Sequence, residues 1–155
     1  MVSIKWCMNQ KNGLELVAPS ENLAKSYLNM AKESLNIIDN VSKSRIWTAT
    51  TAYYIFYYSL YSLMSRIGVK CEIHSCSLEF MKRFLMEFYN TTDMQMIRKA
   101  FDARIDLQYY SDRPVDIKVI NEIKKYCGDF YTKTKEIIIK IREADINEIR
   151  GLLEK

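Results

Sequence analysis

One segment of the chain, residues 42–67, constrains the fold more than any other. Its apolar and aromatic side chains recur at helical spacing and cover every face of the predicted helix, so the helix must be buried nearly all round. Five of them are tyrosines, whose hydroxyls need hydrogen-bond partners, and one flank is therefore expected to meet a polar cleft or a second subunit. Gly68 is placed to end this helix as a left-handed cap. The side chains are Trp47, Tyr53, Tyr54, Phe56, Tyr57, Tyr58, Leu60, Tyr61, Leu63 and Met64.

The composition favours a single all-α domain. The 155 residues are 48% hydrophobic and include only four glycines and two prolines, too few for a turn-rich β-sandwich or for repeated βα loops. A net charge of +4 is mildly basic and is not typical of a protein that lives on DNA. No signal peptide or charge-free stretch of membrane-spanning length is evident, so we expect a cytoplasmic protein with no membrane association.

The periodic segments predict an antiparallel up-and-down bundle of five to six helices. Residues 1–18 form a short extended arm, with a hairpin at Asn12-Gly13 as one arrangement, and residues 19–155 form the bundle. Pro114 is expected in the first turn of the longest helix. The predicted helices cover residues 20–40, 42–67, a third that Ser77 caps, a fourth from Thr91, a fifth from Pro114 to about 142, and a last helix capped by Asp145.

The four cysteines are expected to be reduced and partly buried, because a chain without a secretory signal is predicted to reside in a reducing compartment. Cys71 and Cys76 flank His74, but this spacing is not that of a zinc finger and no second pair of ligands follows. We therefore expect no metal and no cofactor.

His74 is the only histidine of the chain and the first candidate for chemistry at neutral pH. Metal-free RNA cleavage needs a group that moves a proton at the ribose 2′-hydroxyl and a cation that stabilises the phosphorane. His74 and Arg66 can supply these two groups. Alternatively, His74 caps or bridges backbone groups at the start of the third helix.

The sequence resembles the small prokaryotic HEPN (higher eukaryotes and prokaryotes nucleotide-binding) proteins. The resemblance rests on three motifs in order. They are Ala52-Tyr53-Tyr54-Ile55-Phe56-Tyr57 on a helix, His74-Ser75 after a glycine and a short loop, and Ala103-Arg104-Ile105-Asp106-Leu107-Gln108-Tyr109-Tyr110. A long helix with Phe130 follows, and the resemblance covers residues 20–142.

The resemblance implies a helical bundle, often a homodimer, with a cleft that contains an arginine and a histidine. Active members cut RNA without metal through Arg and His separated by four to six residues, whereas here seven residues separate Arg66 from His74. Many members act with a minimal nucleotidyltransferase as the toxin side of a toxin–antitoxin pair. A subset carries a tyrosine where this chain has Cys76.

Further residues are expected to contact a nucleotide or RNA in such a cleft: Lys70, Ser75, Arg104, Tyr54 and Tyr58. Each has a simpler alternative. Arg104 has Asp102 and Asp106 nearby on one helix, which favours a local ion-pair network. Tyrosines at helical spacing are more often core than a platform for bases, above all Tyr53 and Tyr57.

Three functions stay open at this stage. The first is a HEPN-type protein that binds a nucleotide, RNA or a minimal nucleotidyltransferase partner. The second is a metal-independent endoribonuclease that uses His74 and Arg66. The third is a non-catalytic dimeric interaction module built on the tyrosine-rich helix.

Overall fold

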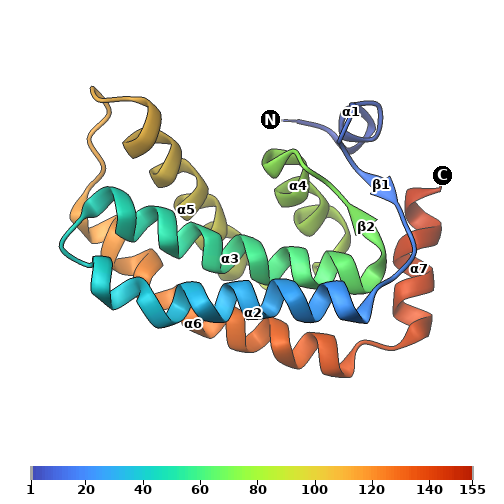
Figure 1. Ribbon diagram of the computed structural model, residues 1–155. Coiled ribbons are helices and arrows are strands. Elements are labelled where there is room, and N and C mark those ends of the chain that lie inside the picture. Colours follow the sequence, from blue (N-terminus) through green and yellow to red (C-terminus); the bar gives the residue numbers. More distant parts are fainter. Residues whose placement is uncertain (1, 155) are drawn as a thin grey trace.

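The computed structural model describes residues 2–154 and confirms an all-α fold. Seven α-helices occur in this range, one more than the upper expectation, and the sheet found there has two short strands (Figure 1). The elements are α1 (Ile4–Met8), β1 (Glu15–Leu16), α2 (Glu21–Ile37), the 3₁₀-helix η1 (Ile38–Val41), α3 (Arg45–Ile67), β2 (Val69–Lys70), α4 (His74–Phe84), α5 (Thr91–Tyr109), α6 (Ile117–Lys140) and α7 (Glu143–Leu153). No helix in residues 2–154 combines the length and the apolar character needed to cross a membrane.

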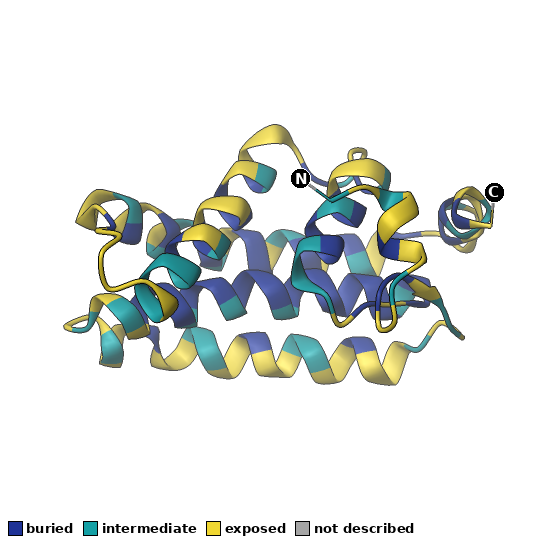
Figure 2. Cartoon of the chain, turned by 90° about the horizontal axis from the view of Figure 1, so that it is seen from above, coloured by how far each residue is buried: buried dark blue, intermediate teal, exposed yellow. Residues whose placement is uncertain are grey.

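The central element is α3, as its all-round apolar surface predicts. It packs against α2, α5 and α6 (Figure 1), and its residues are mostly buried while the outer helices turn exposed faces to the solvent (Figure 2). Tyr53 and Phe56 are fully buried. Trp47 near its start is the exception, with 56% of its surface exposed.

The end of α3 is fixed by the glycine that the sequence indicates, but its start is displaced from the expected Ser42 to Arg45. At the start, Trp47 N donates to Ser44 Oγ over 3.2 Å, so Ser44 is the cap. At the end, Gly68 has a φ of 85°, a left-handed conformation that favours glycine. Arg150 of α7 completes this end, because its Nη1 donates to the carbonyls of Gly68 and Val17 over 2.8 Å each and to that of Ile67 over 3.1 Å.

The amino-terminal arm differs from the prediction, since residues 4–8 form the helix α1 instead of an extended strand. Ser3 caps it by accepting from Trp6 N over 3.2 Å, and this local bond favours helix over strand. The turn at Asn12 and Gly13 exists, but no hairpin with residues 4–8 results. Instead β1 pairs with β2 in an antiparallel register, Glu15 opposite Lys70 and Leu16 opposite Val69.

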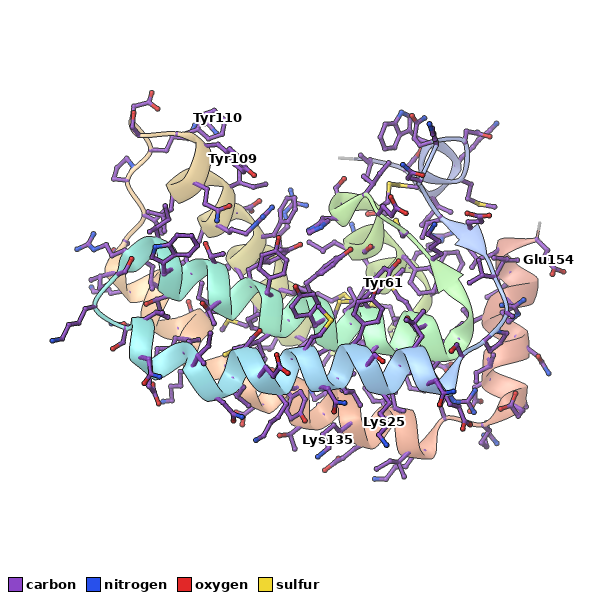
Figure 3. The ribbon with its side chains drawn as sticks, in the orientation of Figure 1. Lys25, Tyr61, Tyr109, Tyr110, Lys135 and Glu154 are labelled. Atoms are coloured by element: carbon purple, nitrogen blue, oxygen red, sulfur yellow. A yellow bond between two sulfur atoms is a disulfide. The ribbon has the colours of Figure 1, made fainter. Side chains whose placement is uncertain are left out.

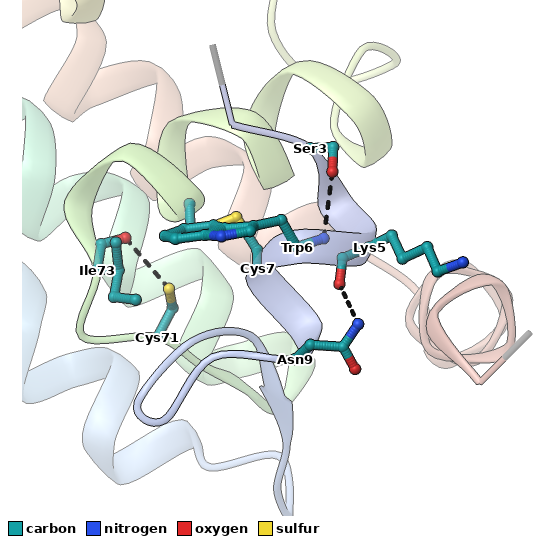
Figure 4. Close-up of a disulfide and its surroundings, with 8 residues drawn as sticks. Ser3, Lys5, Trp6, Cys7, Asn9, Cys71 and Ile73 are labelled. Carbon is teal, nitrogen blue, oxygen red and sulfur yellow. Dashed lines mark hydrogen bonds between the residues drawn. A yellow bond between two sulfur atoms is a disulfide. The ribbon is translucent and has the colours of Figure 1, made fainter.

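A disulfide between Cys7 and Cys76 joins α1 to α4 (Figure 4), so the expectation of reduced thiols is wrong for these two residues. Their Cα atoms lie 5.6 Å apart although 69 positions separate them in sequence. The pairing depends on Cys7 lying on a helix that docks against α4, which the expectation of an extended arm did not provide. Cys71 and Cys127 are free and buried.

Three further predicted helix starts are displaced. The helix α4 begins at His74 instead of after Ser77, and Ser77 is buried within it. The helix α7 begins at Glu143, so Asp145 is not its cap but accepts from the backbone N of Arg142 over 3.0 Å. Pro114 precedes α6, whose cap is Asp116.

The fourth predicted helix is confirmed in place as α5, and its first turn is tied to α6. Asn90 and Asp93 form a reciprocal capping box. Asp93 is fully buried and accepts from Lys133 Nζ over 2.6 Å and from the Tyr126 hydroxyl over 2.9 Å. This network ties the first turn of α5 to α6. It thereby helps to position α5, the helix that carries Arg104.

Candidate functional site

His74 is the first residue of α4, and its ring lies against the tyrosines of α3. Its Nδ1 is 2.6 Å from the Tyr53 hydroxyl. Its ring stacks on that of Tyr57, with centroids 4.0 Å apart and planes 9° apart. A buried hydroxyl needs an acceptor, so we assign the Tyr53 proton to this bond, which leaves the proton of the neutral imidazole on Nε2.

Arg104 of α5 reaches the same tyrosines from the neighbouring helix. The centre of its guanidinium lies 4.8 Å from the ring centroid of Tyr53 and 5.6 Å from that of Tyr54. Its Nη1 donates to the Tyr54 hydroxyl over 3.4 Å, and its Nε is buried without a hydrogen-bond partner among the described residues. We call His74, Tyr53, Tyr54, Tyr57 and Arg104 the His74 cluster.

The ion-pair network expected around Arg104 does not form. Asp102 accepts from Arg98, and Asp106 accepts from Arg113, each over 3.3 Å. No acidic side chain of residues 2–154 pairs with Arg104 within 4.0 Å. The two carboxylates lie on other faces of α5, whereas Arg104 points toward α3. The guanidinium charge of Arg104 is therefore balanced by aromatic rings alone.

Burial and the nearby guanidinium set the protonation states of the cluster. Burial, and then the charge of Arg104, lower the pKa of His74 from 6.5 to about 4. Burial also raises the pKa of the Tyr53 and Tyr57 hydroxyls well above the ordinary value of 10.0. At neutral pH the imidazole of His74 is thus neutral, and Tyr53 and Tyr57 keep their phenolic protons.

Two of the predicted site residues lie outside the cluster. Arg66 is paired with Glu143 over 2.7 Å and with Glu21 over 3.7 Å, which ties α3 to α7 and α2. It lies about 13 Å along the helix axis from Tyr57, given the rise of an α-helix. Lys70 is exposed on β2 and pairs with Glu72 over 3.0 Å. The structure does not bring Arg66 to His74.

The other predicted residues lie in or beside the cluster. Tyr54 and Arg104 belong to it, and Ser75 follows His74 in the first turn of α4. Tyr58 is half-buried, and its ring centroid lies 5.2 Å from that of Tyr54 and 6.3 Å from that of Tyr27 on α2. Tyr61, labelled in Figure 3, is the last of the row of five tyrosines along α3, and its hydroxyl accepts from Cys71 N over 3.1 Å. Tyr58 thus extends the aromatic surface of the cluster beyond Tyr54.

Tyr53 and Tyr57 were predicted as core, and they are core, but they also make the closest contacts of His74. Their spacing of four residues places them on one face of α3, so a ring that contacts one contacts both. The sequence alone predicts that Tyr53 and Tyr57 share a face of α3. It does not predict that α4, with His74, packs over that face.

Two hollows of the surface lie away from the His74 cluster and include none of its residues. One, of about 510 Å³ between the end of α2 and α6, is lined by Asp39, Lys124 and Lys125 among others. Lys124 and Asp39 already pair there over 2.7 Å. No group of three or more His, Cys, Asp or Glu side chains in residues 2–154 is arranged to hold a metal ion.

No family model, curated protein or solved structure matches the chain. The function is therefore inferred from the geometry of the His74 cluster.

Proposed function

We propose that the His74 cluster binds the phosphate group of a nucleotide or of RNA. The observation that carries this proposal is Arg104, a partly buried guanidinium that has aromatic rings but no carboxylate beside it. A guanidinium presents a planar fork of donors that fits a phosphate. A phosphate beside the guanidinium would balance its charge.

The other members of the cluster support the same ligand. The Nε2–H of His74 is a neutral donor in the assigned tautomer, and donors of this kind bind phosphate oxygens. Tyr54 and Tyr58 are half-buried and offer ring surface on which a base can stack. A ligand with one phosphate and an adjoining base therefore fits the cluster better than a bare anion.

We also propose that the chain is a HEPN-type protein, with a minimal nucleotidyltransferase as partner and a toxin-side role in a toxin–antitoxin pair. The all-α fold is compatible with that resemblance. The proximity of His74 and Arg104, two residues of the motifs that carry it, supports the same assignment.

A metal-independent endoribonuclease is the alternative function, and the geometry supports Arg104 in place of Arg66 as its phosphate clamp. His74 would then move the proton at the ribose 2′-hydroxyl. A free-state pKa of about 4 makes His74 a poor proton donor at neutral pH. Since the positive charge of Arg104 contributes to this low pKa, a bound phosphate would raise it. Binding is therefore the first proposal, and cleavage follows only if the ligand shifts the pKa far enough.

A homodimer is the third proposal, supported by an apolar surface that α2 leaves exposed. Leu23, Met30 and Ile37 recur every seven residues and are 40–50% exposed. Tyr27 lies in the same stripe and contacts Tyr58 and Tyr61, so the stripe borders the tyrosine row of α3. An interface above roughly 1,000 Å² is expected for a stable dimer.

The test measures binding and cleavage of labelled RNA oligonucleotides and of nucleotides, with and without EDTA. Arg104→Gln should weaken binding by about tenfold or more, since a charge-assisted contact contributes about 1.5–3 kcal/mol. Arg98→Gln on the same helix is the matched control and should bind as the unmodified chain does. If cleavage occurs, His74→Ala should reduce it by about 10²-fold. Equal binding by the Arg104 and Arg98 variants would contradict the proposal.

A further inference from the structure

The disulfide between Cys7 and Cys76 connects the first turn of α4, where His74 lies, to the small helix α1. His74 and Cys76 are the first and third residues of α4. Any movement of that turn therefore moves the imidazole relative to Tyr53 and Tyr57, which belong to α3.

The first turn of α4 lacks the side-chain cap that most helix starts have. Ile73 is in the cap position and provides no side-chain oxygen. A Ser, Thr, Asp or Asn in its place would stabilise the turn by about 1 kcal/mol. The remaining local bonds are those from the backbone N of Cys76 and of Ser77 to the carbonyl of Ile73. The disulfide is thus the strongest connection that this turn makes outside α4.

The helix α1 is held to the fold by this bond and by the segment that follows it, where Leu14 N donates to the carbonyl of Cys7 over 3.0 Å and Glu72 N donates to that of Asn12 over 2.9 Å. The helix itself is small. It has five residues, of which Cys7 is the one that is buried, while Trp6 and Met8 are more than 40% exposed. A helix of this length is not stable by itself in water. Local opening of α1 would expose the two sulfur atoms to a reductant.

We propose that the Cys7–Cys76 disulfide is a redox-sensitive tether that holds His74 against Tyr53 and Tyr57, so that its reduction disorders the His74 cluster. A dithiol reductant attacks one sulfur, the S–S bond breaks, and a mixed disulfide forms. The second thiol of the reductant then displaces the remaining cysteine. Two electrons and two protons reach Cys7 and Cys76, which become thiols, and the reductant becomes a disulfide.

The consequence for a ligand rests on the proposed function, whereas the tether itself does not. When His74 leaves the tyrosines, it is hydrated and moves away from Arg104, and both causes of its low pKa weaken together. The titratable or charged groups that the structure places against the imidazole are Tyr53, Tyr54 and Tyr57 of α3 and Arg104 of α5. Arg104 keeps its own contacts with α3 in either state.

The experiment is an NMR titration of His74, whose imidazole signals need no assignment because it is the only histidine. The oxidised protein should titrate at about 4, and the reduced protein should titrate closer to the 6.5 of an ordinary histidine. The Cys7→Ser/Cys76→Ser variant should match the reduced protein without reductant. Cys127→Ser, which keeps the disulfide, should match the unmodified protein in both conditions.

Two results would overturn the tether. One is an unchanged imidazole titration after complete reduction, verified by alkylation in denaturant and mass spectrometry. The other is a general loss of the helical circular dichroism signal on reduction, because the whole fold and not the His74 cluster alone would then have opened. Binding of a nucleoside monophosphate, AMP, is measured on the same samples and should weaken on reduction. If AMP binds in neither state, the proposed function is wrong, and the imidazole titration still decides the tether.

Discussion

The hydroxyl of Tyr53 lies 2.6 Å from Nδ1 of His74, and this contact joins the most buried helix of the fold to the only histidine of the chain. It fixes which nitrogen of the ring is free, since Nδ1 accepts from the phenol and Nε2 keeps the proton. With the Arg104 guanidinium centre 4.8 Å from the Tyr53 ring centroid, the cluster presents a neutral donor and a positive charge without a carboxylate partner.

The buried state of His74 predicts a pH-dependent stability. In the unfolded chain His74 takes up a proton near 6.5, whereas in the folded protein it does so only at about 4. Below 6.5 the unfolded state therefore binds more protons, and the free energy of unfolding falls as the pH is lowered toward 4. Urea unfolding between pH 7 and 4.5 should show a steeper fall for the unmodified chain than for His74→Gln. Parallel pH profiles would rule out a depressed pKa.

Arg150 is predicted to stabilise the junction of α3, β1 and α7. Its Nη1 donates to three carbonyls, those of Val17, Ile67 and Gly68. Arg150→Ala leaves these acceptors without their charged donor and should lower the free energy of unfolding by about 2 kcal/mol. Arg98→Ala, which removes an exposed ion pair, should change it by less than about 0.5 kcal/mol. Equal effects of the two variants in urea unfolding would contradict this role.

The sequence predicted the helical bundle well because α3 allows few alternative arrangements of the other helices. A helix with aromatic residues on all faces must lie at the centre, and the glycine at its end defines where it stops. Local patterns failed where tertiary contacts decide. Ile73 has no side-chain oxygen that could cap a helix, so the sequence does not mark the start of α4 at His74. The nearby Ser77 is a typical capping residue and therefore suggests a later start.

The candidate site was predicted in part for the same reason. His74 and Arg104 were singled out as residues, but their proximity depends on how α4 and α5 pack over α3. Arg66 was paired with His74 because the two are close in sequence, yet the chain between them turns through Gly68 and β2. The disulfide escaped prediction because its two cysteines meet only after α1 docks.

The disulfide should contribute strongly to stability, because it closes a loop of 69 residues. Loop-closure entropy predicts that reduction lowers the free energy of unfolding by about 4 kcal/mol. Urea unfolding with and without a reductant measures this, with Cys127→Ser as a control for the free thiols. An unchanged midpoint after verified reduction would show that the bond does not stabilise the fold.

The apolar stripe of α2 should mediate dimer formation. Light scattering of the unmodified chain is expected to report a dimer, and Met30→Glu together with Ile37→Glu should yield a monomer with unchanged circular dichroism, because both side chains are exposed. Lys25→Glu, at an exposed position of the same helix outside the stripe, should remain dimeric. A monomer at high micromolar concentration of the unmodified chain would contradict the dimer.

The central claim is that a phosphate binds between His74 and Arg104, and its most direct test is an NMR titration of the His74 imidazole with a nucleotide. We predict saturable shifts of the imidazole signals and a pKa of His74 that rises from about 4 when the ligand is bound. Both effects should be lost in Arg104→Gln and kept in Arg66→Gln. Imidazole signals that do not move at millimolar nucleotide, or that move equally in Arg104→Gln, would contradict the account.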